Sequence, residues 1–227
     1  MENYIITISR RFASKGHEIA GRMSDILGIP VYDRSAVEAR VQSLETMERL
    51  PEDADQDAVR ERGRADSGGR GLFKGLLRRE IRDELRDEAQ LEFERQSEVI
   101  RSLADEGPCI ILGRCADQIF EEHPRALHIF IYARDEDRIR NTMDMLHIQE
   151  EEARVMLLNE DRARDAYRKR FLTHPSDEVT GRHILIDSGK LGVEKCADLL
   201  VQAAKYLFLE EVLSAVRYKD PAGEERR

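Results

Sequence analysis

Short, uninterrupted apolar runs recur along the chain, separated by longer stretches in which apolar residues lie three and four positions apart. The first pattern predicts buried strands and the second predicts amphipathic helices. The predicted strands lie at 4–9, 31–33, 109–112, 126–133 and 183–187. The predicted helices lie at 19–27, 36–50, 72–105, 134–146, 149–171 and 192–209, with one more between the third and fourth strands. Because strands and helices alternate, we expect an α/β fold with a doubly wound parallel sheet, helices on both faces and right-handed crossovers.

Composition narrows the class of protein. The 227 residues suit one large α/β domain or two small ones, and a net charge of −9 argues against a general nucleic-acid binder. No apolar run approaches the roughly 18 residues of a membrane span, and we expect no signal peptide. The three cysteines, Cys109, Cys115 and Cys196, have no metal-ligand spacing and form a poor disulfide framework. We therefore expect a cytoplasmic protein without a membrane partner and without a metal site of its own.

The segment after the first predicted strand has the layout of a phosphate site. Residues 10–18 form a polar loop between a strand and a helix, and the first amides of a helix have no partner inside it. The cations around this point are Arg10, Arg11, Lys15 and His17. The standard loop G-x-x-x-x-G-K-[ST] is not present, because Gly16 is the one loop glycine and the lysine precedes it. An ordinary turn with a solvated basic loop is therefore the alternative.

Two further strand ends carry polar residues where open α/β sheets bind ligands. Asp33 and Arg34 follow the second strand, and either a ligand site or a surface salt bridge explains them equally well. Gly113 and Arg114 follow the third strand. A glycine there permits close backbone approach, and the planar guanidinium fork suits phosphate, so we expect Arg114 to be functional. His128, inside the fourth strand, is expected to be structural.

Two charged stretches allow alternative interpretations. Residues 51–71 are polar and contain four glycines, so we interpret them as a flexible loop or the tip of an insertion, with a functionless linker as the alternative. The predicted helix at 149–171 ends in a cluster of cations, in which Arg164 and Arg168 share one face. Asp161 and Asp165 are interleaved with these arginines, so a self-paired, solvated helix is the alternative to an anion site.

Several segments resemble the cytidylate kinase-like family, a branch of the P-loop nucleoside monophosphate kinases. They are ITISRRFASKGHEIA (6–20), LGIPVYDR (27–34), QSEVIRSLADEGPCIILGRCAD (96–117), IFIYA (129–133) and LGVE (191–194). The resemblance covers most of the chain except residues 45–80, and the 96–117 block is its most specific part. It implies a single P-loop kinase-type domain over 1–212 with a five-stranded parallel sheet, and a tail at 213–227. A helical acceptor-type insertion would occupy 36–95, with its flexible part at 51–71, and a lid-like region would occupy 149–180.

The resemblance also implies a reaction, in which ATP with Mg²⁺ phosphorylates a nucleoside monophosphate, with CMP or dCMP as the first expectation. The residues expected to bind the donor are Arg10, Ser14, Lys15, Gly16 and His17. The residues expected to bind the acceptor are Asp33, Arg34, Arg114 and Arg168. The residues expected to be catalytic are Lys15, Arg114, Arg162 and Arg164, of which Arg162 and Arg164 match lid arginines. The expected partners are small-molecule nucleotides, without nucleic acid.

The phosphate loop departs from the family pattern. The family commonly has G-S-G-G where this chain has Ala-Ser-Lys-Gly at 13–16, and alanine and lysine adopt positive φ less readily than glycine. Gly16 stands in place of the conventional lysine and Glu18 in place of the following Ser/Thr, so the usual cation and a Mg²⁺ ligand are missing. Lys15 or His17 is the hypothesis for a replacement cation.

A second departure lies at the third strand, where Leu112 stands in place of the first Asp of the D-G-R-D motif of true cytidylate kinases.

Because of these two departures, two alternatives to a kinase stay open. One is a non-catalytic nucleotide sensor or regulatory protein with the same fold. The other is a structural or interaction protein whose ligand site is vestigial.

Overall fold

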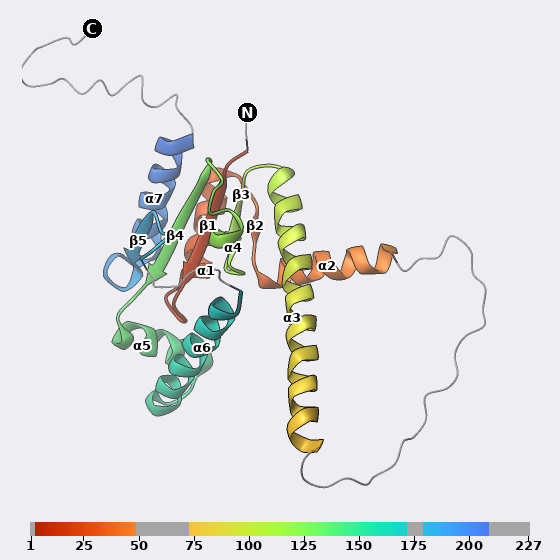
Figure 1. Ribbon diagram of the computed structural model, residues 1–227. Helices are drawn as coiled ribbons and strands as arrows, with labels where there is room; N and C mark the ends of the chain where they lie inside the picture. Colours follow the sequence, from red (N-terminus) through yellow and green to blue (C-terminus); the bar gives the residue numbers. More distant parts are fainter. Residues whose placement is uncertain (1–2, 49–72, 172–178, 209–227) are drawn as a thin grey trace, which may run out of the picture. The chain divides into compact units, whose positions relative to one another are not determined.

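The computed structural model describes residues 3–48, 73–171 and 179–208 (Figure 1). The expected flexible segment 51–71 and the expected tail 213–227 lie outside these residues, as does part of the lid-like region. The chain divides into two compact units, one of Met1–Arg34 with Ile100–Arg227 and the other of Ser35–Val99. Each is described by itself.

A five-stranded parallel sheet forms the centre of the first unit (Figure 1). Its strands are β1 (Ile5–Arg10), β2 (Val31–Tyr32), β3 (Cys109–Leu112), β4 (Ala126–Tyr132) and β5 (Ile184–Asp187). The strand order is β2-β3-β1-β4-β5, and every neighbouring pair is parallel. Ile6 of β1 lies opposite Ile110 of β3 and Leu127 of β4. The predicted doubly wound parallel sheet is confirmed, and the carboxyl ends of β1, β2 and β3 meet at one edge.

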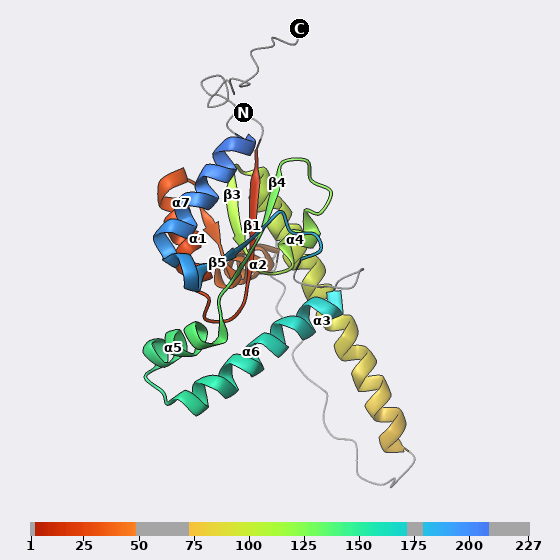
Figure 2. The ribbon, with the colours of Figure 1, turned by 90° about the vertical axis from the view of Figure 1, so that its left-hand side faces the viewer.

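Helices cover both faces of this sheet. The helices of the first unit are α1 (Gly16–Leu27), α4 (Ala116–Ile119), α5 (Asp135–Leu146), α6 (Glu150–Phe171) and α7 (Ser188–Phe208). Figure 2 shows α1 and α7 side by side on one face and α4 on the other. Helix α7 begins earlier than the predicted 192, but Gly192 interrupts it with a φ of 77°. Helix α2 (Arg34–Glu48) and most of α3 (Phe73–Asp105) form the second unit.

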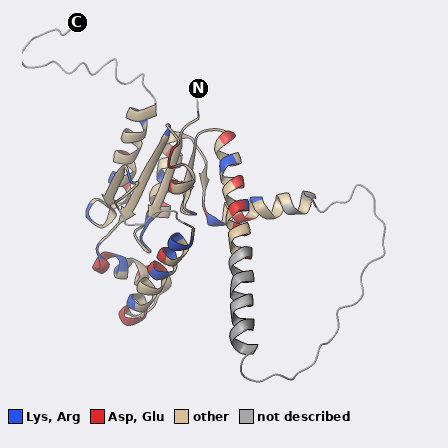
Figure 3. Cartoon of the chain, in the orientation of Figure 1, with Lys and Arg blue, Asp and Glu red and all other residues tan. Residues whose placement is uncertain are grey.

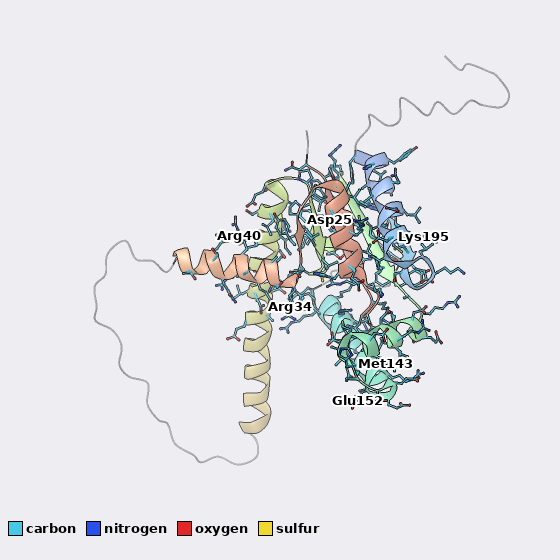
Figure 4. The ribbon with its side chains drawn as sticks, turned by 180° about the vertical axis from the view of Figure 1, so that it is seen from behind. Asp25, Arg34, Arg40, Met143, Glu152 and Lys195 are labelled. Carbon is cyan, nitrogen blue, oxygen red and sulfur yellow. The ribbon has the colours of Figure 1, made fainter. Side chains whose placement is uncertain are left out.

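The core of the first unit consists of the central strands and the inner faces of α1 and α7. Ile6, Ile8 and Ile110 are fully buried, which is why their strands read as continuous apolar runs instead of alternating ones. Burial of each such side chain stabilises the fold by about 1.5–3 kcal/mol. The outer helical faces carry charge, as Asp25 on α1 and Lys195 on α7 show (Figure 4).

Helices α5 and α6 form an antiparallel pair with a small core of their own (Figure 2). Ile139 of α5 packs with Leu157 of α6, and Phe12 and Ala13 of the loop after β1 pack against them. Met143, labelled in Figure 4, belongs to the same cluster. The pair is therefore joined to the loop that the sequence singled out. Within the described ranges, no helix is both long and apolar enough to cross a membrane.

Candidate functional site

Two residues of the loop between β1 and α1 have a left-handed backbone conformation. Ala13 has a φ of 56° and Lys15 a φ of 57°, both in the region that glycine usually occupies. This conformation costs a residue with a side chain roughly 1–2 kcal/mol, so the surrounding structure must hold the loop in place. Lys15 directly precedes α1, which begins at Gly16.

Hydrogen bonds to side chains hold this loop. The amide of Asn141 on α5 donates to the carbonyl of Ala13 at 2.8 Å, and the hydroxyl of Ser188 donates to the carbonyl of Ser14 at 2.8 Å. The Ser14 hydroxyl itself donates to the carbonyls of Arg11 at 2.9 Å and Ile131 at 3.2 Å. Ser14 is buried, so its hydroxyl turns towards the sheet, and a ligand role for this residue would rest on its backbone.

A cavity of about 410 Å³, which we call the loop pocket, lies over this loop. Lys15, Gly16 and His17 line it from the start of α1. The opposite wall comes from α5, through Asn141, Asp144 and Met145. The first amides of α1 and the positive end of its dipole suit an anion at this place.

A second cavity of about 440 Å³, which we call the arginine pocket, lies at the carboxyl ends of β1 and β3 beneath α6. Leu112, Phe130 and Tyr167 contribute apolar walls, and Glu160, Asp161 and Asp165 contribute acids. Its cations are more numerous: Arg10, Arg11, Arg34, Arg114, Arg164, Arg168, Lys169 and Arg182. Figure 3 shows the lysines and arginines of α6 gathered towards its C-terminal end. The arrangement suits a ligand with an apolar part and a multiply charged anionic part.

The two pockets adjoin, because Arg10, Arg11 and Arg164 line both of them. The pKa of Arg10 is lowered to about 10, first by burial and then by the charge of Arg164, while Asp33 raises it and Arg114 lowers it further. Arg10 therefore remains protonated at neutral pH. Burial also lowers the pKa of Arg164, which means that the guanidiniums of Arg10 and Arg164 are both partly withdrawn from water.

Three consecutive left-handed residues follow β3 and shape one wall of the arginine pocket. Gly113, Arg114 and Cys115 have φ values of 83°, 58° and 53°. The guanidinium of Arg114 lies 5.3 Å from the ring centroid of Tyr167 on α6. A cation over an aromatic face is attracted by the ring quadrupole, so Tyr167 orients Arg114 within the pocket.

Sequence reasoning missed Asp117, which binds two of the pocket arginines. Its Oδ1 accepts from Arg168 Nη1 at 3.0 Å and its Oδ2 from Arg168 Nη2 at 2.9 Å, while Arg182 donates to Oδ2 as well. The Ser9 hydroxyl lies 3.4 Å from Oδ1. Burial alone would raise the pKa of Asp117, but Arg168 and Arg182 together lower it to about 2. The only sequence signal was an acid just after the Gly-Arg turn.

Asp161 of α6 bonds outside its own helix, whereas Glu150 and Glu160 pair with Arg154 and Arg164 of α6 itself. Asp161 Oδ1 accepts from the backbone N–H of Phe12 at 3.0 Å, and its Oδ2 accepts from Arg138 of α5 at 2.7 Å. Arg11 lies 3.6 Å from the same carboxylate. These contacts attach α6 to the loop and to α5, because a half-buried carboxylate gains more from several donors than from an exposed neighbour on its own helix.

The predicted site residues divide between the pockets. Ser14, Lys15, Gly16 and His17 line the loop pocket, Arg34, Arg114 and Arg168 line the arginine pocket, and Arg10 and Arg164 line both. Arg162 is exposed, and neither Arg162 nor Asp33 lines either pocket. Asp33 Oδ2 lies 3.9 Å from His17 Nδ1.

Among residues 3–48, 73–171 and 179–208, no group of three or more His, Cys, Asp or Glu side chains could hold a metal ion.

A family model and a solved structure agree with this architecture. The sequence model of the cytidylate kinase-like family matches residues 5–190. An uncharacterized protein from Eubacterium ventriosum ATCC 27560 shares the fold, with a TM-score of 0.64 at 19% identity over 89% of this chain and 98% of that one. A gluconokinase from Sinorhizobium meliloti 1021 gives a TM-score of 0.48 at 13% identity, over 92% of this chain and 98% of that one. No curated protein matches the chain.

Proposed function

We propose, because the chain belongs to the cytidylate kinase-like family, that it transfers a phosphoryl group from ATP to a nucleoside monophosphate, with CMP or dCMP as the first candidates. The observation that carries this proposal is the pair of adjoining pockets that share Arg10, Arg11 and Arg164. Phosphoryl transfer requires little covalent chemistry from the protein. It requires two substrates held in line and cations at the group that moves between them.

The donor would bind in the loop pocket. Its phosphates would face the first amides of α1 at Lys15, Gly16 and His17, and its nucleoside would extend along α5 towards Asn141 and Met145. Mg²⁺ would arrive with the nucleotide, held by phosphate oxygens and water, which is a common binding mode for this ion. The ion would supply charge neutralisation on the phosphates.

The acceptor would bind in the arginine pocket. Arg34, Arg114 and Arg168 line it and would bind the acceptor phosphate, and Phe130 and Tyr167 would offer apolar surface for the base. Arg164, shared with the loop pocket, would stabilise charge on the transferred group. Each of these assignments follows from charge and position, since a guanidinium fork matches the oxygens of a phosphate.

The test is formation of ADP from ATP and Mg²⁺ with CMP, dCMP, UMP, AMP and GMP supplied one at a time. We expect ADP that depends on one of the acceptors and that Arg114→Ala reduces by roughly 100-fold or more, as loss of a preorganised charge does in other enzymes. The matched control is Arg22→Ala, because Arg22 is exposed on α1 and pairs with Glu194 at 2.8 Å. Equal ADP formation by both variants would contradict the role of the arginine pocket.

A nucleotide-binding regulatory protein without catalysis is the second candidate, and Glu18 favours it. Glu18 lines the loop pocket beside the start of α1. A carboxylate there repels phosphate unless a cation lies between them. This candidate predicts saturable nucleotide binding without acceptor-dependent ADP.

A reducing, cytoplasmic setting and small-molecule partners belong to the same proposal. Cys109, Cys115 and Cys196 are all free and buried. Burial raises the pKa of the Cys109 thiol to about 12 and that of Cys115 to about 11, which makes both unreactive at neutral pH.

A further inference from the structure

We infer that Arg10 supplies the positive charge that a standard phosphate loop takes from its lysine, and this inference rests on the proposed function of the loop pocket. In G-x-x-x-x-G-K-[ST], the lysine follows the opening glycine by six positions. With the lysine position at residue 16, the opening glycine falls at residue 10. This chain has arginine at 10 and glycine at 16, so the glycine and the cation have exchanged places.

The residues at positions 10 and 16 depend on each other because their side chains would occupy the same space. A Cβ atom on Gly16 would lie 3.0 Å from both Cβ and Cγ of Arg10, which is closer than nearly all real contacts of this kind. Any side chain at position 16, a lysine included, would therefore push against the stem of Arg10. The glycine at 16 makes room for the arginine at 10, and the two departures from the standard loop are one change.

Gly113 makes room for the other end of the same side chain. A Cβ atom on Gly113 would overlap Nη1 of Arg10, so a side chain at this position would displace the guanidinium. The aliphatic stem of Arg10 therefore packs beside Gly16 of α1, and its guanidinium lies beside Gly113, directly after β3. These two glycines leave room for the guanidinium where the loop pocket meets the arginine pocket, since Arg10 lines both.

The charges around Arg10 favour an anion at that place. Arg164 and Arg114 are close enough to lower its pKa, and Asp33 offsets them in part. Like charges that are brought together in a partly buried site repel each other, and an anion bound among them relieves the repulsion. Arg168 differs, because Asp117 binds it through two hydrogen bonds.

Lys15 and His17 are less suited to the role that the sequence suggested for one of them. Lys15 and His17 line the loop pocket but not the arginine pocket. The transferred group, by contrast, must lie between the two pockets. The side chain of His17 is 72% exposed, and Lys15 is exposed as well. A charge in water is screened far more strongly than one withdrawn from it, so Arg10 would act more strongly on a bound phosphate.

The experiment measures binding of inorganic tripolyphosphate and of ATP by isothermal titration calorimetry. Arg10→Met keeps the length of the stem and removes the charge, and we expect it to weaken tripolyphosphate binding roughly 10-fold or more. Lys15→Met should change binding by less than about 3-fold, because its charge is solvated. Gly16→Ala should weaken binding by displacing Arg10. Its matched control is Gly21→Ala on the same helix, where an added Cβ would meet no atom within 4 Å.

A reciprocal pair of substitutions sharpens the test. Arg10→Gly alone and Gly16→Lys alone should each lose affinity, whereas the two together recreate the standard order of glycine and lysine and should regain most of it. The inference is overturned if Arg10→Met binds tripolyphosphate as tightly as the wild type, if the loss follows Lys15→Met instead, or if the wild type does not bind it. Arg10-dependent binding without ADP formation from any acceptor would overturn the kinase proposal and leave the role of Arg10 intact.

Discussion

Asp117 holds two arginines of the arginine pocket with one buried carboxylate. We predict that Asp117→Asn lowers the free energy of unfolding by about 3 kcal/mol, because it leaves Arg168 and Arg182 buried without their counter-charge. Urea denaturation followed by circular dichroism measures this change. The comparison variant is Glu194→Gln, which breaks the exposed pair with Arg22 and should cost less than about 1 kcal/mol. Similar losses for the two variants would show that Asp117 is an ordinary surface partner.

His128 gives the fold a dependence on pH. The residue is buried in β4, its Nδ1 lies 2.8 Å from the Thr7 hydroxyl, and its ring stacks on His183. Burial, followed by the charge of His183, lowers the pKa of His128 to about 4. Below its ordinary pKa of about 6.5, the unfolded chain therefore binds a proton that the folded protein does not bind. The stabilisation is complete above about pH 6.5 and declines as the pH falls towards 4, by up to about 3 kcal/mol.

The measurement is the free energy of unfolding in urea at about pH 7 and about pH 5. The wild type should lose stability between the two, and His128→Gln should lose clearly less, because it does not titrate. His123→Gln, at an exposed position, should behave as the wild type does. If His128→Gln lost as much stability between the two pH values as the wild type, the pH dependence would belong to other groups.

The contrast between Arg114 and Asp117 shows which site residues the sequence can reveal. Arg114 follows an apolar run and a glycine at the end of a parallel strand, so the local pattern was sufficient to place it at the sheet edge, where it lines the arginine pocket. The partner of Asp117 is Arg168, which lies 51 positions further along the chain, and no spacing rule predicts a pairing at that distance. Ser14 shows a second limit, since its loop position was predicted but not the inward direction of its hydroxyl.

Helix α6 is attached to the rest of the first unit by Asp161, which receives the Phe12 amide and Arg138. We predict that Asp161→Asn increases amide hydrogen exchange along α6 and at Phe12 by roughly 10- to 100-fold, because a neutral amide does not supply the negative charge that the buried Arg138 pairs with. Mass spectrometry of exchanged peptides measures this. Asp165→Asn is the control, because Asp165 is half exposed and lies 3.9 Å from Arg11. Equal exchange in both variants would mean that Asp161 does not attach the helix.

Secondary structure was predictable because each element depends on nearby residues. In the part of the chain that the structure describes, the strands and helices lie where apolar spacing placed them, within a few positions at the ends. The observed ends of helices differ from the predicted ones where the backbone adopts a positive φ, as at Lys15 before α1. A single sequence does not reveal a positive φ at a residue other than glycine. The bonding of Asp161 was not predictable, because an acid on a helix can pair with a residue four positions away, as Glu160 does with Arg164, or bond elsewhere.

The family and the sheet followed from the sequence, whereas the division of cations between two pockets did not. A chain with a net charge of −9 gives no indication from composition of a cavity lined mainly by arginine. The cavity forms because β1, β3 and α6, far apart in sequence, converge at one edge of the sheet. All residues that line the two pockets belong to the unit of Met1–Arg34 with Ile100–Arg227.

A nucleotide should therefore stabilise that unit. ATP at 100 times its dissociation constant adds about 2.7 kcal/mol, which raises the melting temperature of a unit of this size by roughly 5–10 °C. Scanning calorimetry is the suitable method, because the chain has no tryptophan. Sodium chloride at equal ionic strength is the control for general screening. A shift with ATP fits both the kinase and the regulatory protein, whereas no shift with ATP, CMP or both would favour a vestigial site.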